Sequence, residues 1–497
     1  MSRHRDRNYA VFVLAAGLTS LLLYGVGLWA QRALFLNGLE VRAEDFAFRG
    51  EPADRVQMRL QFAIYTGATV AVFAIYVGIL MAAKSGSLRS RRALVLAVVV
   101  FPLLFHAFLL GARPSFSIDL MSYVAHGSIA ADLDGSPYLQ PTSDALATPV
   151  GEELVTSFGW EPVHPVTPYG PLWTNAEVLA TRVTNEASGA LLVLKLIVAG
   201  ASLASGCLIW WILGHVRPGA QTLGTIAYMW NPMILNELAG EGHNDAVMVV
   251  LVLVALGLLV GGRLVGSTVA TTLAVLTKYL PVVFLPAQLV YVWRTRRSGR
   301  RLALELAAGT VLSAATVIAI YSPVWAGAAT FDGVREASER TFIASTSGTV
   351  FFALSHVLSD AQAARATSLL LGGAFAAYVV VRSIQVRDAG GLLSASAAIA
   401  LAYVLVASPS FWPWYHVLPV ALLALTPTSA SLALIITLSL GSRLVAPLEV
   451  VRENGFISWS LEVWTTTTLA IFVPLALVLA VLKPWRPRRG VVRQRPA

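Results

Sequence analysis

The sequence predicts an all-α, polytopic membrane protein, and three observations support this fold class. Charged residues make up only 13% of the 497 residues, against about 25% in ordinary globular domains. Hydrophobic residues make up 56% and recur in runs close to the ~20 residues that a helix needs to cross a bilayer. Most of the basic excess behind the net charge of +9 lies in short segments between those runs. Basic residues in that position mark cytoplasmic loops, so we expect no nucleic-acid partner.

The composition also excludes two other classes. A disordered chain lacks this many apolar side chains, and a disulfide scaffold needs several cysteines, whereas the chain contains only Cys207. We expect a single integral-membrane domain over residues 1–497, without internal repeats and without a soluble domain at either end. Any chemistry is therefore expected in the outer loops and at helix ends.

Three spans are expected before the longest polar stretch, at residues 9–30, 61–83 and 93–111. Arginines precede the first span as in a signal peptide, but the apolar run is too long and no small-residue cleavage site follows it. We therefore expect an uncleaved span with a cytoplasmic N-terminus. Basic residues after the second span place that loop inside, so residues 112–189 form a large extracytoplasmic loop.

Nine further spans are expected at residues 190–214, 221–239, 246–261, 302–322, 363–383, 391–409, 416–427, 428–442 and 463–482. Residues 267–293 contain two shorter apolar arms separated by Lys278 and Pro281, which indicates a broken helix pair buried in protein. The total is twelve to fourteen spans, depending on how these arms are counted. An even number returns the basic tail, residues 483–497, to the cytoplasm, so both termini are expected there.

The first candidate site follows the third span. In a helix that starts near Ser117, Asp119, Tyr123 and His126 are spaced i, i+4 and i+7 and share one face. Apolar residues such as Met121 would then rest in the membrane interface. The same pattern also fits a carboxylate that only complements the helix dipole from the first turn.

Aromatic residues in the same loop are a second feature. Tyr169 and Trp173 belong to the turn Pro-Tyr-Gly-Pro-Leu-Trp. Their rings could stack on the apolar faces of sugars, and they could equally anchor the loop at the membrane interface.

Another polar cluster joins two apolar segments, where His243, Asn244 and Asp245 follow two glutamates in a tight turn. A metal site is one interpretation, but the spacing matches no standard ligand set. A hydrogen-bonded turn is the favoured interpretation, and we predict no metal ion or other cofactor.

Two basic or titratable residues lie at the outer ends of apolar segments. Lys278 separates the two short arms, and His416 ends the aromatic loop Trp-Pro-Trp-Tyr-His. A cation at this depth is costly unless it meets an anion or extends to the interface. Together they are candidates for binding a lipid phosphate.

These motifs resemble the actinobacterial polyprenol-phosphomannose-dependent α-1,6-mannopyranosyltransferases, integral-membrane glycosyltransferases of the GT-C class. The resemblance is carried by Asp119 in the first large outer loop, the Tyr169-Gly-Pro turn, the His243-Asn-Asp turn, the Lys278 break and the loop ending at His416. It covers roughly residues 93–416.

The resemblance implies an inverting transfer of mannose, at the outer face of the plasma membrane, from polyprenol-phosphomannose to the α-mannoside of a mannan lipid-glycan acceptor in lipomannan and lipoarabinomannan assembly. Asp119 would be the catalytic base, and Lys278 and His416 would bind the donor phosphate. The residues expected to bind sugar are Tyr123, His126, Tyr169, Trp173, His243, Asn244 and Asp245.

Two other functions are compatible with many spans. A transporter or lipid flippase would use the broken arms near Lys278 and would need polar groups at mid-membrane, but few ionisable residues fall there and the long outer loop would have no role. A scaffold of cell-wall assembly would need none of the outer motifs for glycan synthesis.

Overall fold

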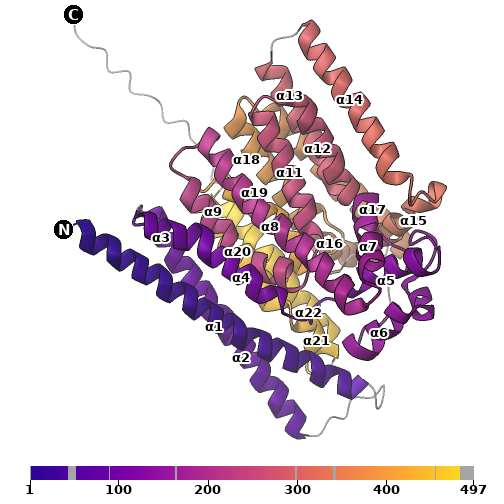
Figure 1. Ribbon diagram of the computed structural model, residues 1–497. Coiled ribbons are helices and arrows are strands. Elements are labelled where there is room, and N and C mark those ends of the chain that lie inside the picture. Colours follow the sequence, from indigo (N-terminus) through magenta and orange to yellow (C-terminus); the bar gives the residue numbers. More distant parts are fainter. Residues whose placement is uncertain are drawn as a thin grey trace, which may run out of the picture.

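The computed structural model describes residues 2–42, 52–88, 90–162, 165–296, 299–339, 343–453 and 455–481. Over these residues the protein is helical, and the only β-type pairing is an isolated bridge between Ile343 and Ser410. The predicted basic tail, residues 483–497, lies outside the described residues. Figure 1 shows the helices packed around a central bundle that includes α8, α11 and α19.

The first third of the chain forms three long helical segments and a loop with short helices. The segments are α1 (Ser2–Arg42), α2 (Pro52–Lys84) and the continuous run α3 (Arg91–Val95), η1 (Leu96–Val100) and α4 (Phe101–Leu110). The loop contains α5 (Asp119–Asp132), η2 (Thr142–Ala147), α6 (Pro149–Phe158) and α7 (Pro171–Thr184).

The middle of the chain alternates long and broken helices. These are α8 (Ala187–Val216), α9 (Gln221–Met229), α10 (Pro232–Ile234), η3 (Leu235–Gly240), α11 (Asp245–Val260), α12 (Leu264–Thr277), η4 (Leu280–Phe284) and α13 (Leu285–Thr295). The predicted break in residues 267–293 is present, because α12 ends at Thr277 and Lys278 is extended.

The last part of the chain begins with α14 (Arg300–Tyr321), η5 (Gly327–Phe331), α15 (Asp332–Glu339), α16 (Thr346–Ser355) and α17 (Asp360–Ile384). It continues with α18 (Ala389–Ala402), η6 (Tyr403–Ala407), η7 (Pro413–His416), α19 (Val417–Ala424) and α20 (Ser429–Val445). It ends with α21 (Leu448–Glu453), α22 (Trp459–Thr466), η8 (Thr467–Phe472) and α23 (Val473–Val481).

Among the described residues, nine helices are long and apolar enough to cross a membrane, and a pair bent by 116° at residues 241–244 would be a tenth. The expected twelve to fourteen spans were too many by this criterion, although each predicted apolar segment is helical. The two arms are too short, because α12 has 14 residues and α13 only 11, less than the ~17 residues that a crossing needs. Among the other twelve, α19 has only 8 residues, and the two spans predicted on either side of residues 241–244 count as one bent pair.

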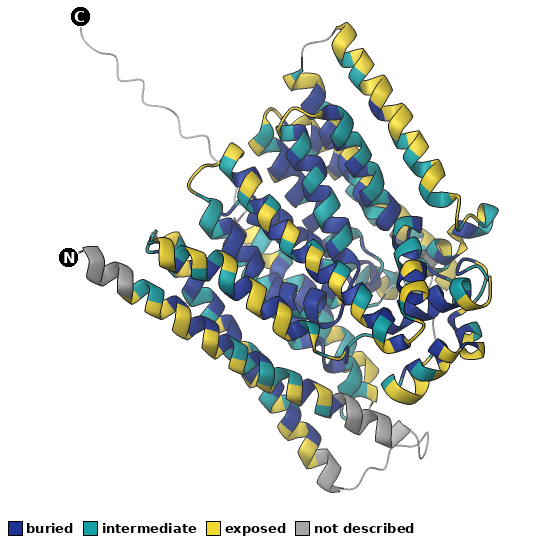
Figure 2. Ribbon diagram, viewed as in Figure 1, coloured by how far each residue is buried: buried dark blue, intermediate teal, exposed yellow. Residues whose placement is uncertain are grey.

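Apolar helices at the periphery are exposed, as lipid contact requires. Figure 2 shows α14 exposed along most of its length, whereas α11 is largely buried. The polytopic membrane fold predicted from composition is therefore confirmed.

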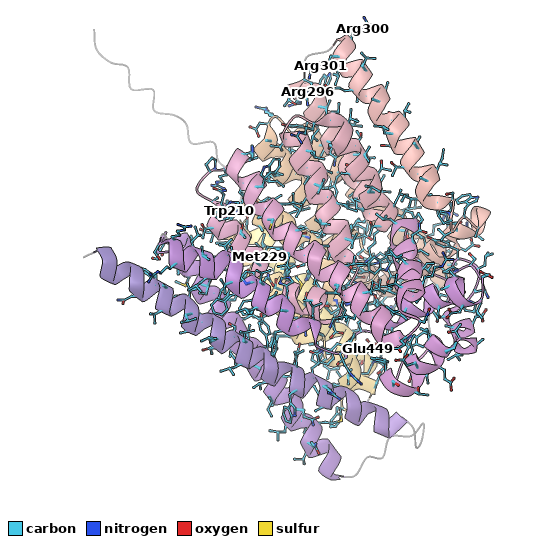
Figure 3. All side chains as sticks on the ribbon, viewed as in Figure 1. Trp210, Met229, Arg296, Arg300, Arg301 and Glu449 are labelled. Atoms are coloured by element: carbon cyan, nitrogen blue, oxygen red, sulfur yellow. The ribbon has the colours of Figure 1, made fainter. Side chains whose placement is uncertain are left out.

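The connections gather on two opposite faces. On one face Lys84 Nζ donates to Ser429 Oγ at 2.8 Å, and Arg296 donates to the carbonyl of Gly262. Figure 3 labels Arg296 with Arg300 and Arg301 at the connection between α13 and α14. On the other face, which we call the site face, residues 111–162, 165–186, 241–244, 278–279 and 408–416 come together.

Candidate functional site

Asp119 is the first residue of α5, and the local sequence fixes it there. Ser117 Oγ accepts a hydrogen bond from the Asp119 amide at 3.1 Å, a local side-chain interaction that favours a helix start. The helix behind it is buried from Asp119 to Ile129. Met121, like Val124, therefore packs inside the protein, and the expectation that Met121 rests in the membrane interface was wrong.

Two tyrosines surround the Asp119 carboxylate. The hydroxyl of Tyr169 donates to Asp119 Oδ2 at 3.1 Å, and that of Tyr123 lies 3.4 Å from the same oxygen. Burial is the main reason that the pKa values of both phenols are raised well above 10. Both hydroxyls therefore keep their protons and favour the ionised carboxylate.

The turn containing His243 closes the other side of Asp119. His243 Nδ1 lies 3.6 Å from Asp119 Oδ2, and its Nε2 lies 3.4 Å from Glu237 Oε2. A carboxylate facing each ring nitrogen favours the cationic imidazolium. The ring also stacks on Trp414, with centroids 3.8 Å apart.

The backbone explains why this turn can approach α5. Gly242 has a φ of +82°, a left-handed conformation that favours glycine. A Cβ at this position would lie 2.9 Å from Leu120. Glycine therefore allows the turn to pack directly against the first turn of α5, which brings His243 to Asp119.

Glu237 connects the site to a buried cation. Arg443 of α20 donates from Nη1 to Glu237 Oε1 at 2.6 Å and from Nη2 to the hydroxyl of Tyr65 at 2.6 Å. Both members of the ion pair are almost fully buried, with side-chain exposures of 2% and 3%. Arg443, Glu237, His243 and Asp119 thus form a row of alternating charge, and such pairing is what makes buried ions tolerable.

Glu241 fixes the start of the Asp119 loop. It accepts from Gln31 Nε2 at 2.5 Å and from the amides of Ser115 and Phe116 at 3.0 and 3.4 Å. The polar turn therefore fixes the position of residues 115–116, which lead into α5.

Lys278 lies beside the same cluster. Its Nζ donates to Asp245 Oδ2 at 2.6 Å and lies 5.5 Å from the centroid of the Tyr169 ring. The Lys278 side chain is 18% exposed. Tyr169 therefore contacts both the carboxylate at Asp119 and the ammonium at Lys278, and the next residue, Gly170, donates its amide to the carbonyl of Thr277 at 3.0 Å.

His416, the last residue of the aromatic loop, is fully buried. Its Nδ1 lies 2.7 Å from Ser442 Oγ and 3.1 Å from the carbonyl of Leu438. Within the described part of the chain, no contact joins it to Lys278. The predicted pair of phosphate ligands is thus not brought together.

His126 and Trp173 lie behind the carboxylate. His126 Nδ1 faces Glu177 Oε2 at 3.9 Å, whereas Trp173 packs edge-on against Tyr123 with centroids 5.2 Å apart. Of the three residues predicted on one face of α5, Asp119 and Tyr123 meet, and His126 turns to α7. Burial raises the pKa of Glu177 well above its ordinary value.

The remaining predicted residue, Asn244, is fully buried. Its amide oxygen and nitrogen have no hydrogen-bond partner among the described residues. A buried amide of this kind has unused hydrogen-bonding capacity for water or a ligand hydroxyl. No group of three or more His, Cys, Asp or Glu side chains within the described ranges is arranged to hold a metal ion.

Sequence reasoning missed Arg443, Tyr65, Gln31 and Glu177. Arg443 could have been predicted from the sequence, because an arginine near the end of an apolar run is costly in a membrane unless it is paired. Gln31 and Tyr65 had none, since a single polar group in a long helix does not indicate its partner. Lys195, a cation within α8, donates to the carbonyls of Leu109 and Ala112 at the end of α4.

Similarity to known proteins covers the segments that carry Asp119, Tyr169, His243 and Lys278. The family described as "Alpha-(1->6)-mannopyranosyltransferase, N-terminal domain" matches residues 14–294. The chain is 31% identical over 230 residues to alpha-(1->6)-mannopyranosyltransferase A of Mycobacterium tuberculosis, which covers 44% of this chain and 42% of that protein. It is 25% identical over 363 residues to the protein of the same name from Corynebacterium glutamicum, covering 66% and 69%. The chain thus matches less than half the length of the mycobacterial relative.

Proposed function

We propose that this chain, which belongs to the alpha-(1->6)-mannopyranosyltransferase family, transfers mannose from polyprenol-phosphomannose to an α-mannoside acceptor with inversion at the anomeric carbon. The product would be an α-1,6-linked mannoside of lipomannan or lipoarabinomannan. The observation that carries the proposal is the Asp119 carboxylate, held by Tyr169 at 3.1 Å and facing His243 at 3.6 Å, beside a partly exposed lysine.

Asp119 acts as the general base. The acceptor oxygen attacks the anomeric carbon and forms the new glycosidic bond, while the bond from that carbon to the donor phosphate oxygen breaks. The acceptor proton passes to Asp119, and polyprenyl phosphate leaves. The phenols and the imidazolium keep Asp119 ionised before the reaction, and the leaving phosphate needs charge stabilisation more than a proton.

Lys278 is the proposed ligand of the donor phosphate. Its ammonium has three donors, and its pairing with Asp245 positions it next to Tyr169. His416 is left out of the proposed phosphate site, because it is fully buried and is not brought together with Lys278. Asn244 would bind a sugar hydroxyl through its buried amide.

The site face is proposed to be extracytoplasmic at the plasma membrane, with both termini in the cytoplasm. The basic residues of the α13–α14 connection, on the opposite face, support this orientation.

The test uses purified full-length protein in lipid nanodiscs with polyprenol-phosphomannose and a short α-mannoside. Asp119→Asn should lower the rate of mannoside extension by roughly 10²- to 10⁴-fold while donor binding persists. Asp134→Asn is the matched control, because Asp134 is exposed and has a φ of +49°, which asparagine adopts readily. Near-normal turnover by Asp119→Asn would remove Asp119 as the base.

A further inference from the structure

A cavity of about 200 Å³ lies on the site face between the aromatic loop and the last helices. Its walls come from residues far apart in the sequence: Phe116, the bridge segment at Ala344, the loop at Trp412 and Trp414, and the α21–α22 region. None of the residues predicted from the sequence to bind the donor or the acceptor lines it.

Trp414 connects this cavity to the catalytic cluster. The Trp414 side chain lines the cavity and also stacks on His243, whose Nδ1 faces Asp119. Phe116, another lining residue, precedes Asp119 by three positions and donates its amide to Glu241. The cavity and the proposed base are therefore neighbours that share one aromatic wall.

The aromatic wall is held in place by ring stacking and by contacts to its loop. The rings of Trp412 and Trp414 are nearly parallel, at 9°, with centroids 5.4 Å apart. The loop that carries them is held by Ser345 Oγ, which donates to the carbonyl of Pro409 at 2.7 Å, and by the bridge between Ile343 and Ser410. Trp412 keeps 39% of its surface exposed, so its ring is available to a ligand.

The opposite wall is charged. Arg452 Nε lies 2.5 Å from Glu462 Oε2, and its Nη2 lies 3.7 Å from Glu449 Oε1. All three side chains line the cavity, and Figure 3 labels Glu449, which belongs to α21. Carboxylates and a guanidinium offer several acceptors and donors in a fixed arrangement, which suits the neighbouring hydroxyls of a sugar.

An isoprenoid chain would not fit this wall, because apolar groups gain nothing beside charges that must stay solvated or paired. A separate cavity of about 150 Å³ between α16 and α22 has an apolar lining that includes Phe352 and Trp464. The two cavities share Ala344, Trp459 and Val463 and differ in their charge. The charged cavity therefore matches a saccharide better than a lipid.

We propose that this cavity is a saccharide subsite for the acceptor, holding a mannosyl residue next to the one whose hydroxyl reaches Asp119. Trp412 provides the apolar stacking face, and Glu449 and Arg452 bind hydroxyls. The inference rests on the proposed mannosyl transfer for its place in the reaction, while binding of a mannoside to the cavity can be measured without it.

The experiment compares acceptors of one, two and three α-1,6-linked mannosyl residues at saturating donor. With the native protein, KM for the acceptor should fall as the acceptor grows from one residue to two or three. Trp412→Ala and Glu449→Ala should each raise KM for the longer acceptors roughly 3- to 10-fold, with kcat and the donor KM nearly unchanged. The conservative variants Trp412→Phe and Glu449→Gln should recover most of the affinity.

Trp325→Ala is the matched control, because Trp325 is 55% exposed and does not line the cavity. Binding of mannotriose to each purified variant, measured by calorimetry, provides a readout that does not need turnover. Trp412-dependent binding without any transfer would keep the subsite and reject the proposed function. Active transfer with acceptor KM unaffected by both alanine variants, or binding unchanged by them, would overturn the subsite.

Discussion

At the scale of single residues, the main feature is a buried row of alternating charges. Arg443 pairs with Glu237 at 2.6 Å, and Glu237 faces His243, which faces Asp119. Removing one member of a buried pair leaves an uncompensated charge, which costs about 3–5 kcal/mol. Arg443 and Glu237 are therefore positioning residues, since they act on Asp119 only through His243.

Arg443→Met is expected to destabilise the protein by about 3–5 kcal/mol, because it leaves Glu237 buried without its cation. The double variant Arg443→Met with Glu237→Met should recover much of that stability, since no charge is then stranded. Thermal unfolding of the four proteins in one detergent gives the coupling energy. If the loss of unfolding free energy in the double variant equals the sum of the losses in the two single variants, the ion pair is contradicted.

Glu177 gives a pH-dependent prediction. Burial raises the pKa of the folded carboxyl, so the folded protein binds a proton that the unfolded chain releases above about pH 4.3. Glu177 therefore lowers stability progressively as the pH rises from that value towards its folded pKa. Glu177→Gln, which resembles the protonated acid, should stabilise the protein at pH 8 and change little at pH 5.

Melting curves of both proteins between pH 5 and pH 8 measure this difference. His126 is present in both, and it faces Glu177 at 3.9 Å. If the two formed an ionised pair, Glu177→Gln would instead be destabilising near neutral pH, so the sign of the change decides between the two states.

Residue-level prediction from the sequence succeeded where neighbours in the chain form the contact. Asp119 and Tyr123 are one helical turn apart and meet as expected. Arg443 and Glu237 are 206 positions apart, so no local pattern indicates their pairing. Helical spacing predicted only that His126 shares a face of α5 with Asp119. The partner that His126 meets is Glu177 of α7, which is distant in the sequence.

At the scale of secondary-structure elements, the site depends on two helix breaks that face each other. One is the turn at residues 241–244, and the other is Lys278. Gly170 connects the second break to the Tyr169 turn, and a Cβ there would lie 2.2 Å from the carbonyl oxygen of Leu276. Both breaks were expected from the polar residues that interrupt the apolar runs, whereas the π-helical turn η3 that carries Glu237 was not.

Gly170→Ala is expected to separate the Tyr169 turn from the Lys278 break. Overpacking of this kind costs about 1–3 kcal/mol, and it should raise the donor KM because Tyr169 and Lys278 move apart. Steady-state kinetics and thermal unfolding measure the two effects. Gly200→Ala is the control, since a Cβ at Gly200 meets nothing within 4 Å; equal effects of the two substitutions would reject this explanation.

At the scale of the whole molecule, composition predicted a polytopic membrane protein. The apolar runs predicted the approximate position of each membrane segment. They overestimated the number of spans, because an apolar run does not indicate where a helix bends or stops. The sorting of loops onto two faces agrees with their charge, because basic connections lie opposite the polar turns of the site face.

The proposed orientation predicts a labelling pattern. In a chain with Cys207→Ala, Thr156→Cys on α6 should react with a membrane-impermeant maleimide in intact cells, whereas Arg217→Cys after α8 should react only in opened cells. Both positions are exposed. The reverse pattern would place the Asp119 cluster in the cytosol, where the proposed lipid donor chemistry would face the wrong side.

The pairing of Arg443 with Glu237 also has a consequence for biosynthesis. The two residues are 206 positions apart, so at roughly 5–20 residues per second the ribosome needs about 10–40 s to produce the arginine after the glutamate. During that interval Glu237 lacks the guanidinium with which it pairs in the folded protein, and His243 is the cation that follows it in the chain. The buried row that ends at Asp119 is therefore completed only when α20 is made, and a chain that ends before α20 keeps Glu237 without its guanidinium partner.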